Sequence, residues 1–164
     1  MDINAKMQKA FSDQITAEIY SSNLYLQMYF WFRKEGWTGF ANWMQQQSDE
    51  EKTHALDMAN FVLNRGGEVK LGAVEAVPAD YKDPKEVFEK TMEHEKHVTE
   101  LIHLLAKAAE EEGDRASSNF IDKYIDEQVQ EETSVRDILN LFRHRTSEDY
   151  AEIDTIVGNR NDNE

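Results

Sequence analysis

Four stretches of this sequence place a carboxylate in the middle of a run of apolar residues. In each stretch the apolar side chains recur at alternating spacings of three and four, as they do along one face of a helix. The carboxylates that interrupt these runs are Glu18, Glu51, Glu95 and Glu131. A buried carboxylate is strongly disfavoured unless a proton, a cationic side chain or a metal ion neutralises it. Since no Lys or Arg lies on these faces in the middle turns, the pattern predicts a buried metal site.

His54 supplies a nitrogen to this predicted site. It follows Glu51 by three residues, so both side chains lie on one face of a helix and within reach of a single ion. A Glu-x-x-His pair alone is a weak signal, but this one lies between Met44 and Met58 on an apolar face. Carboxylate oxygens with imidazole suit iron or manganese and leave coordination positions open for oxygen. Together with single glutamates from two other helices, the pair makes the di-iron carboxylate arrangement of helical bundles.

Glycines and both prolines divide the chain into four long pieces that must position these residues. Apolar spacing predicts helices over about 5–34, 39–66, 84–112 and 115–144. Four helices of similar length form a bundle, and the short links between the first two and the last two favour antiparallel neighbours. Loop 67–83 is long enough to cross the full length of the bundle. We therefore expect an all-α fold, a ferritin-like four-helix bundle with one long crossover loop and a short C-terminal fifth helix over about 146–157, in a single domain over 1–164.

Composition and charge limit the classes of partner and of metal site that are possible for this chain. The chain of 164 residues has 33 acidic and 18 basic side chains and a formal net charge of −15. This charge repels nucleic acid and anionic membrane surfaces and attracts cations. The absence of cysteine excludes disulfides, thiolate metal sites and iron–sulfur clusters. No segment approaches the roughly 20 apolar residues of a membrane span, and no apolar signal core opens the chain. We expect a cytoplasmic protein with neither a nucleic-acid nor a membrane partner.

Four segments resemble the metal-ligand segments of non-haem ferritins of the bacterial and archaeal type. They occur in the family's order and read Glu18-Ile19-Tyr20, Glu50-Glu51-Lys52-Thr53-His54, His94-Glu95-Lys96 and Asp126-Glu127-Gln128-Val129-Gln130-Glu131-Glu132. The resemblance extends over nearly the whole chain, including the crossover loop. It implies that Glu18, Glu51 and His54 hold one iron ion. Glu51 would then bridge to a second ion that Glu95 and Glu131 also hold.

The resemblance assigns roles to two residues beside the metals. Gln128 matches a position that hydrogen-bonds near the two irons. Tyr25 matches a tyrosine that supplies an electron, although an ordinary core aromatic would suit its position equally well. Both residues are therefore candidates for the catalytic site.

Ferritins of this type also carry a third iron site that leads toward an inner cavity. Three of its ligands match Glu50, Glu127 and Glu131 in this sequence. The fourth position is Gln130, whose amide oxygen is a weaker ligand than a carboxylate. The resemblance therefore implies a third site of reduced affinity.

Neighbouring families fit less well. The haem-binding methionine of bacterioferritins corresponds to Lys52, and their second Glu-x-x-His corresponds to Gln128 and Glu131, so no haem is expected. DNA-protecting mini-ferritins take a ligand histidine from the first helix, whereas the first histidine here is His54. Rubrerythrin-like peroxidases add a cysteine-ligated iron, and this chain has no cysteine.

The function that the resemblance implies is iron storage and detoxification. As a ferroxidase, the protein would oxidise Fe(II) with dioxygen, deposit Fe(III) mineral and need iron as its only cofactor. It would assemble into a homo-oligomeric cage of twenty-four subunits built from dimers. A different class of hypothesis remains, namely a metal-free helical scaffold whose mid-helix carboxylates are merely solvated.

Two surface features complete the expectations. The acids that line the three-fold channels of animal ferritins align with Ser118 and Ile121, and nearby Asp114 and Asp122 are candidates to replace them. The histidines outside the predicted site, including His94, are expected at the surface or at subunit contacts.

Overall fold

The computed structural model describes residues 1–159, and helices account for most of them. The long helices are α1 (Ala5–Glu35), α2 (Thr38–Asn64), α3 (Pro84–Glu111) and α4 (Arg115–Phe142). A 3-10 turn at Ser147–Asp149 leads into α5 (Tyr150–Gly158). Over residues 1–159 no strand forms, and no helix is long and apolar enough to cross a membrane. The expected all-α bundle with a short fifth helix is confirmed, while the end of the expected domain, 160–164, lies outside the described residues.

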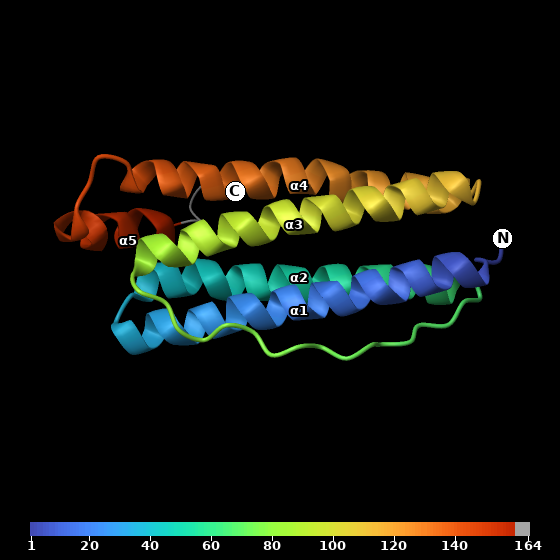
Figure 1. Ribbon diagram of the computed structural model, residues 1–164, viewed down its shortest axis with the longest axis horizontal. Coiled ribbons are helices and arrows are strands. Elements are labelled where there is room, and N and C mark those ends of the chain that lie inside the picture. The colour runs from blue at the N-terminus through green and yellow to red at the C-terminus, as the bar shows by residue number, and fades with distance from the viewer. Residues whose placement is uncertain (160–164) are drawn as a thin grey trace.

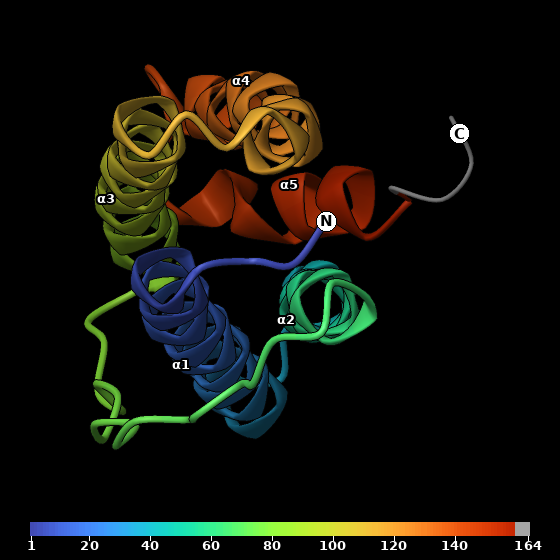
Figure 2. The same cartoon turned by 90° about the vertical axis from the view of Figure 1, so that its right-hand side faces the viewer.

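Two antiparallel hairpins make up the bundle. One consists of α1 and α2 and the other of α3 and α4, and they lie against each other along their length (Figure 1, Figure 2). Each hairpin turns at a glycine in the left-handed region, Gly36 with φ 87° and Gly113 with φ 64°, a conformation that disfavours residues with a Cβ. The segment between α2 and α3 runs back along the bundle and starts α3 at the opposite end (Figure 1). It is the expected crossover.

Helix ends follow local side-chain chemistry. The side chains of Asn4, Asp83 and Asp114 each accept a hydrogen bond from the backbone N–H three residues further on, and so cap α1, α3 and α4. At the other end of α4, the helix stops at Phe142 rather than near residue 144 as predicted. The chain turns extended directly afterwards, and His144 takes a left-handed φ of 59°.

Apolar side chains form two separate cores inside the bundle. The core nearer α5 contains Phe32, Phe40, Phe88, Phe142 and their neighbours. The core at the far end contains Met7, Phe11, Met58, Ile102, Ile121 and their neighbours. Buried polar residues lie between them at mid-helix, among them Glu18, Gln47, Glu51, Glu95 and Gln128. Each long helix therefore contributes to both cores, which fixes the polar layer at one level.

The short helix α5 closes one end of the molecule against the start of α2. The Phe40 N–H donates to Asp154 Oδ1 at 2.7 Å, so a side chain of α5 caps α2, which has no capping side chain of its own. Gly39 allows this approach, because a Cβ there would lie 1.9 Å from the Asp154 carbonyl oxygen. This docking gives α5 a structural role that its sequence did not reveal.

Candidate metal centre

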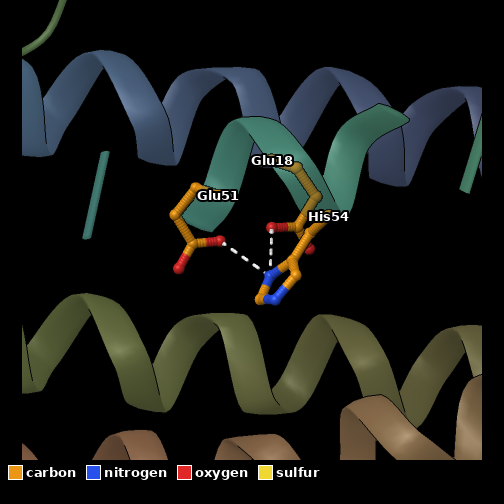
Figure 3. A group of neighbouring side chains, drawn as sticks. All are labelled: Glu18, Glu51 and His54. Atoms are coloured by element: carbon orange, nitrogen blue, oxygen red, sulfur yellow. Dashed lines mark ion pairs between the residues drawn. The ribbon is translucent and has the colours of Figure 1, made fainter. Parts of the chain in front are cut away.

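Glu18, Glu51 and His54 meet between the two hairpins. Glu18 comes from α1, and Glu51 and His54 come from adjacent turns of α2 (Figure 3). One ligand atom from each lies within 4.8 Å of the others. His54 Nδ1 is 3.4 Å from Glu51 Oε2 and 4.0 Å from Glu18 Oε2. The three side chains thus converge on a space that one metal ion could fill.

Burial makes ionisation of the two carboxyl groups of this trio unfavourable. Each is only 2% exposed, and His54 is the only cationic partner that either has among residues 1–159. Burial, reinforced by the charge of Glu51, raises the pKa of Glu18 well above its usual range. Burial and the nearby carboxylates Glu95, Glu131 and Glu50 raise the pKa of Glu51 to about 8. In the metal-free site burial therefore favours the protonated form of both groups, whereas a divalent cation would favour the ionised form.

Glu127 contacts the imidazole of His54 on the side away from Glu51. The Nε2 of His54 lies 3.0 Å from Glu127 Oε2, while its Nδ1 faces Glu51. Burial favours the neutral ring, but the contact with Glu127 and the charges around it raise the pKa of His54 overall. A histidine whose far nitrogen contacts a carboxylate is the usual arrangement of a metal-ligating imidazole. Glu127, which the resemblance assigned to a third site, here orients His54.

Glu95 completes a second set of buried groups from α3. It is fully buried and accepts hydrogen bonds from the Tyr25 hydroxyl and from Gln128 Nε2, the latter at 3.1 Å. Burial raises the pKa of Glu95, and these two donors limit the rise. Burial also raises the pKa of Tyr25 well above its usual range, so the hydroxyl stays protonated and donates a hydrogen bond to Glu95. Tyr25 is both a core aromatic and a direct partner of the predicted site.

The remaining predicted ligands are less enclosed. Glu131 is half-buried and accepts a hydrogen bond from Gln47 Nε2 at 2.9 Å, while Glu50 is half-buried and Gln130 is exposed. Across the described chain, the only group of three acidic or histidine side chains close enough to share an ion is Glu18, Glu51 and His54. The structure therefore brings together the first predicted metal site, but it does not gather Glu50, Glu127 and Glu131 in the same way.

Two glutamines beside the site carried no role in the sequence interpretation. Gln14 Nε2 donates to Glu18 Oε1 at 2.9 Å, and Gln47 Nε2 donates to Glu131. Both glutamines are buried. Each lies one helical turn before a predicted ligand, Glu18 or Glu51, on the same face of its helix. An amide on an apolar face at that spacing is the signal that could have identified them.

Three residues outside the predicted metal site have surroundings that the sequence did not specify. His94, expected at the surface or at a subunit contact, is half-buried, its Nε2 lies 2.7 Å from Ser21 Oγ, and its ring packs edge-on against Tyr25. Asp114 caps α4 and pairs with Arg65 at 2.9 Å, so its carboxylate already has a structural use. Ile121 points into the core, where it is fully buried.

Known proteins are similar to this chain in sequence and in fold. The ferritin-like domain family matches residues 8–144. A bacterial non-heme ferritin of Bacteroides fragilis (strain 638R) is 41% identical over 158 residues, covering 96% of this chain and 99% of that protein. A probable bacterial non-heme ferritin-like protein of Haemophilus influenzae is 36% identical over 143 residues, covering 85% and 87%. The open pore ferritin of Archaeoglobus fulgidus superposes with a TM-score of 0.91 at 43% identity, covering 96% of this chain and 98% of that one. The chain therefore belongs to the ferritin family, and within it to the non-haem ferritins of bacterial and archaeal type.

Proposed function

We propose that this chain is a subunit of an iron-storage ferritin that also acts as a ferroxidase. Its substrates are Fe(II) and dioxygen, and its product is Fe(III) mineral held inside a protein cage. Each subunit is one domain over residues 1–164, and twenty-four subunits assemble through dimers. Family membership supports iron storage, and the buried carboxylate layer supports oxidation within the bundle.

One observation carries the proposal. Glu18 and Glu51 are buried side by side with no lysine or arginine partner within residues 1–159, and Glu18 Oε2 accepts no hydrogen bond there. A protein that needed these groups only for packing would be more stable with apolar residues in their place. Hard carboxylate oxygens and one imidazole nitrogen are a donor set that suits Fe(II). The arrangement is therefore best explained as a site for metal substrates.

The proposed chemistry divides the ligands between two Fe(II) ions. Glu18 and His54 Nδ1 bind one, Glu95 and Glu131 bind the other, and Glu51 lies between them. Both Glu18 and Glu51 would bind in the ionised form, so metal binding would compete with the protonation that burial favours. Because protein ligands fill only part of each coordination sphere, two Fe(II) ions can deliver two electrons to one dioxygen molecule. Apolar cores lie on either side of this level of the bundle.

Tyr25 and Gln128 act on the same reaction through Glu95. Both donate hydrogen bonds to its carboxylate and so orient it toward the second ion. In a further one-electron step, the Tyr25 ring would pass an electron to the oxygen that the two Fe(II) ions have already partly reduced, and its hydroxyl proton would pass to Glu95 along the existing hydrogen bond. Gln128 has no ionisable group, and its role is to hold the Glu95 carboxylate in place.

A third iron position is proposed on the outer side of the pair. Glu50, Glu127 and Glu131 would supply its carboxylates and Gln130 its amide oxygen. Because Glu127 also holds His54, and because Gln130 is exposed, this position should bind iron more weakly than the other two.

The deciding experiment is aerobic addition of Fe(II) to the purified protein, followed by sizing with simultaneous detection of iron. We expect iron to co-elute with a very large particle, and the Fe(III) absorbance to appear faster than in a protein-free control. Iron that stays with small species, or that precipitates at the protein-free rate, would contradict storage.

A matched pair of variants separates oxidation from scaffolding. Glu51→Ala removes the residue shared by both ions and should slow rapid oxidation by at least about 100-fold, the upper end of losses seen when a group supporting a metal is removed. Glu89→Ala removes an exposed carboxylate on α3 and should leave the rate unchanged. If Glu51→Ala oxidises Fe(II) as fast as the parent protein, the bundle is a scaffold.

A further inference from the structure

Gln47 is the buried polar residue at the centre of the bundle whose role is not explained by packing. It is fully buried, one turn before Glu51 on α2, and its Nε2 donates to Glu131 Oε2 on α4 at 2.9 Å. Its Oε1 is also enclosed but accepts no hydrogen bond from any residue in 1–159. An enclosed carbonyl oxygen without a donor is costly, and such groups usually serve a water, an ion or a ligand.

Charge fixes which end of the Gln47 amide faces Glu131. An ionised carboxylate only accepts hydrogen bonds, so the NH2 group must point toward Glu131 when that residue binds a metal. The carbonyl oxygen must then point away from it and can only accept. The chemical partner that fits is a water or hydroxide ligand of the metal, because such ligands become stronger donors when a cation binds them.

We propose that Gln47 is a positioning residue for the second metal ion, orienting Glu131 with its N–H and accepting a hydrogen bond from a metal-bound water with its oxygen. This inference rests on the proposed two-metal function and adds to it which residue tunes which ion. Gln14 provides the counterpart on the first ion, since it is also buried and its Nε2 donates to Glu18 Oε1 at 2.9 Å.

Anaerobic titration of the metal-free, full-length assembled protein with Co(II) tests the proposal without any oxidation step. Groups that orient a metal ligand typically change metal affinity by about 10- to 100-fold. Gln47→Met, of similar length but without an N–H or carbonyl, should weaken the second Co(II) by that factor and leave the first unchanged. Gln14→Met is the matched control and should weaken the first Co(II) instead. The intensity of the Co(II) visible absorption should change for the same ion in each variant.

Gln47→Asn is the second variant, because it keeps the amide and withdraws it by one methylene. It should show the same selective loss at the second ion. Equal weakening of both ions in the Gln47 variants, or no change in either, would overturn the positioning role even if the parent protein binds two Co(II) ions. Fewer than two Co(II) ions per subunit of the parent protein would instead overturn the two-metal proposal and this inference together.

Discussion

At the residue scale, three buried carboxyl groups lower the stability of the metal-free protein, a cost that the proposed metal ions would offset. Glu18, Glu51 and Glu95 are nearly or fully buried, and burial raises the pKa of each. A group whose pKa is raised on folding contributes stability below its unfolded pKa and loses it as the pH rises through the folded pKa. At neutral pH and above, these residues therefore destabilise the metal-free fold, and a bound cation reverses that effect.

Glu18→Gln should stabilise the metal-free protein. The amide keeps the size of the side chain and removes the ionisation that burial opposes, so we expect a gain of about 1 to 2 kcal/mol, or about 2 to 8 °C in Tm for a chain of this size. Thermal melts with a chelator at about pH 8 measure it. Glu100→Gln, at an exposed position on α3, is the control and should shift Tm by less. A lower Tm for Glu18→Gln would contradict the proposal that the buried Glu18 carboxyl destabilises the metal-free fold.

At the element scale, contacts between helix ends hold the bundle together where the cores stop. Arg65, which follows α2, donates to the Asp114 carboxylate and to Ser117 at the start of α4, both at 2.9 Å. At the other end, Asp154 of α5 caps α2 through Phe40. Both contacts join segments far apart in sequence, and neither is implied by helix periodicity.

Asp114→Ala should destabilise the fold by about 1 to 2 kcal/mol near neutral pH, because α4 loses its cap and Arg65 loses its partner. Burial opposes ionisation of this carboxyl, but the hydrogen bonds from Arg65 and Ser117 lower the pKa of Asp114 overall. Its contribution is therefore present above its unfolded pKa and lost as the pH falls through the lower folded value. Denaturant unfolding at about pH 7 and about pH 3 should show the gap between the two proteins closing in acid. A gap that widened in acid would contradict this assignment.

Gly39→Ala should detach α5. The added Cβ would lie 1.9 Å from the backbone oxygen of Asp154, a contact that flexible side chains cannot relieve. We expect a loss of about 2 kcal/mol or more, with faster hydrogen exchange in α5 and in the first turn of α2. Gly72→Ala is the control, since its Cβ would meet only Thr16 at an ordinary 3.7 Å. Unchanged exchange in α5 would show that the backbone contact is dispensable.

At the scale of the whole molecule, the surface of the chain exposes several large apolar side chains. Leu26 and Phe30 on α1 are 37% and 51% exposed, and Leu71 on the crossover segment is 60% exposed. Leu26 and Phe30 line one shallow cavity together with Val74 and Val77. Apolar residues that gather on one face of a soluble protein commonly mark an interface, and the proposed dimer would cover this one.

Phe30→Asp should block assembly. A charge placed within an apolar interface leaves an unpaired buried carboxylate, so we expect the variant to elute as small species while its far-ultraviolet circular dichroism still reports a helical bundle. Light scattering with sizing gives the mass directly. Normal assembly of Phe30→Asp would place the interface on another face of the subunit.

Most of the fold could be predicted from the sequence alone, because its causes are local. Apolar spacing, the capping residues and the glycine turns act within a few residues of chain, and they specified four helices, one long crossover and a short fifth helix. The same periodicity placed Glu18, Glu51 and His54 on inward faces at one level, and the structure brings these three together. The resemblance to ferritins supplied their expected roles.

Only the tertiary structure decided the partners of these residues. Which donor meets which carboxylate depends on the rotation and register of one helix against another, which periodicity leaves open by about a turn. For that reason Gln14, Gln47 and the contact of Glu127 with His54 became visible only in three dimensions. The partners of Asp114 and His94 could not be predicted for the same reason, since Arg65 and Ser21 are remote from them in sequence. The sequence by itself determined the carboxylate layer, and the packing of the two hairpins determined how each carboxylate is held.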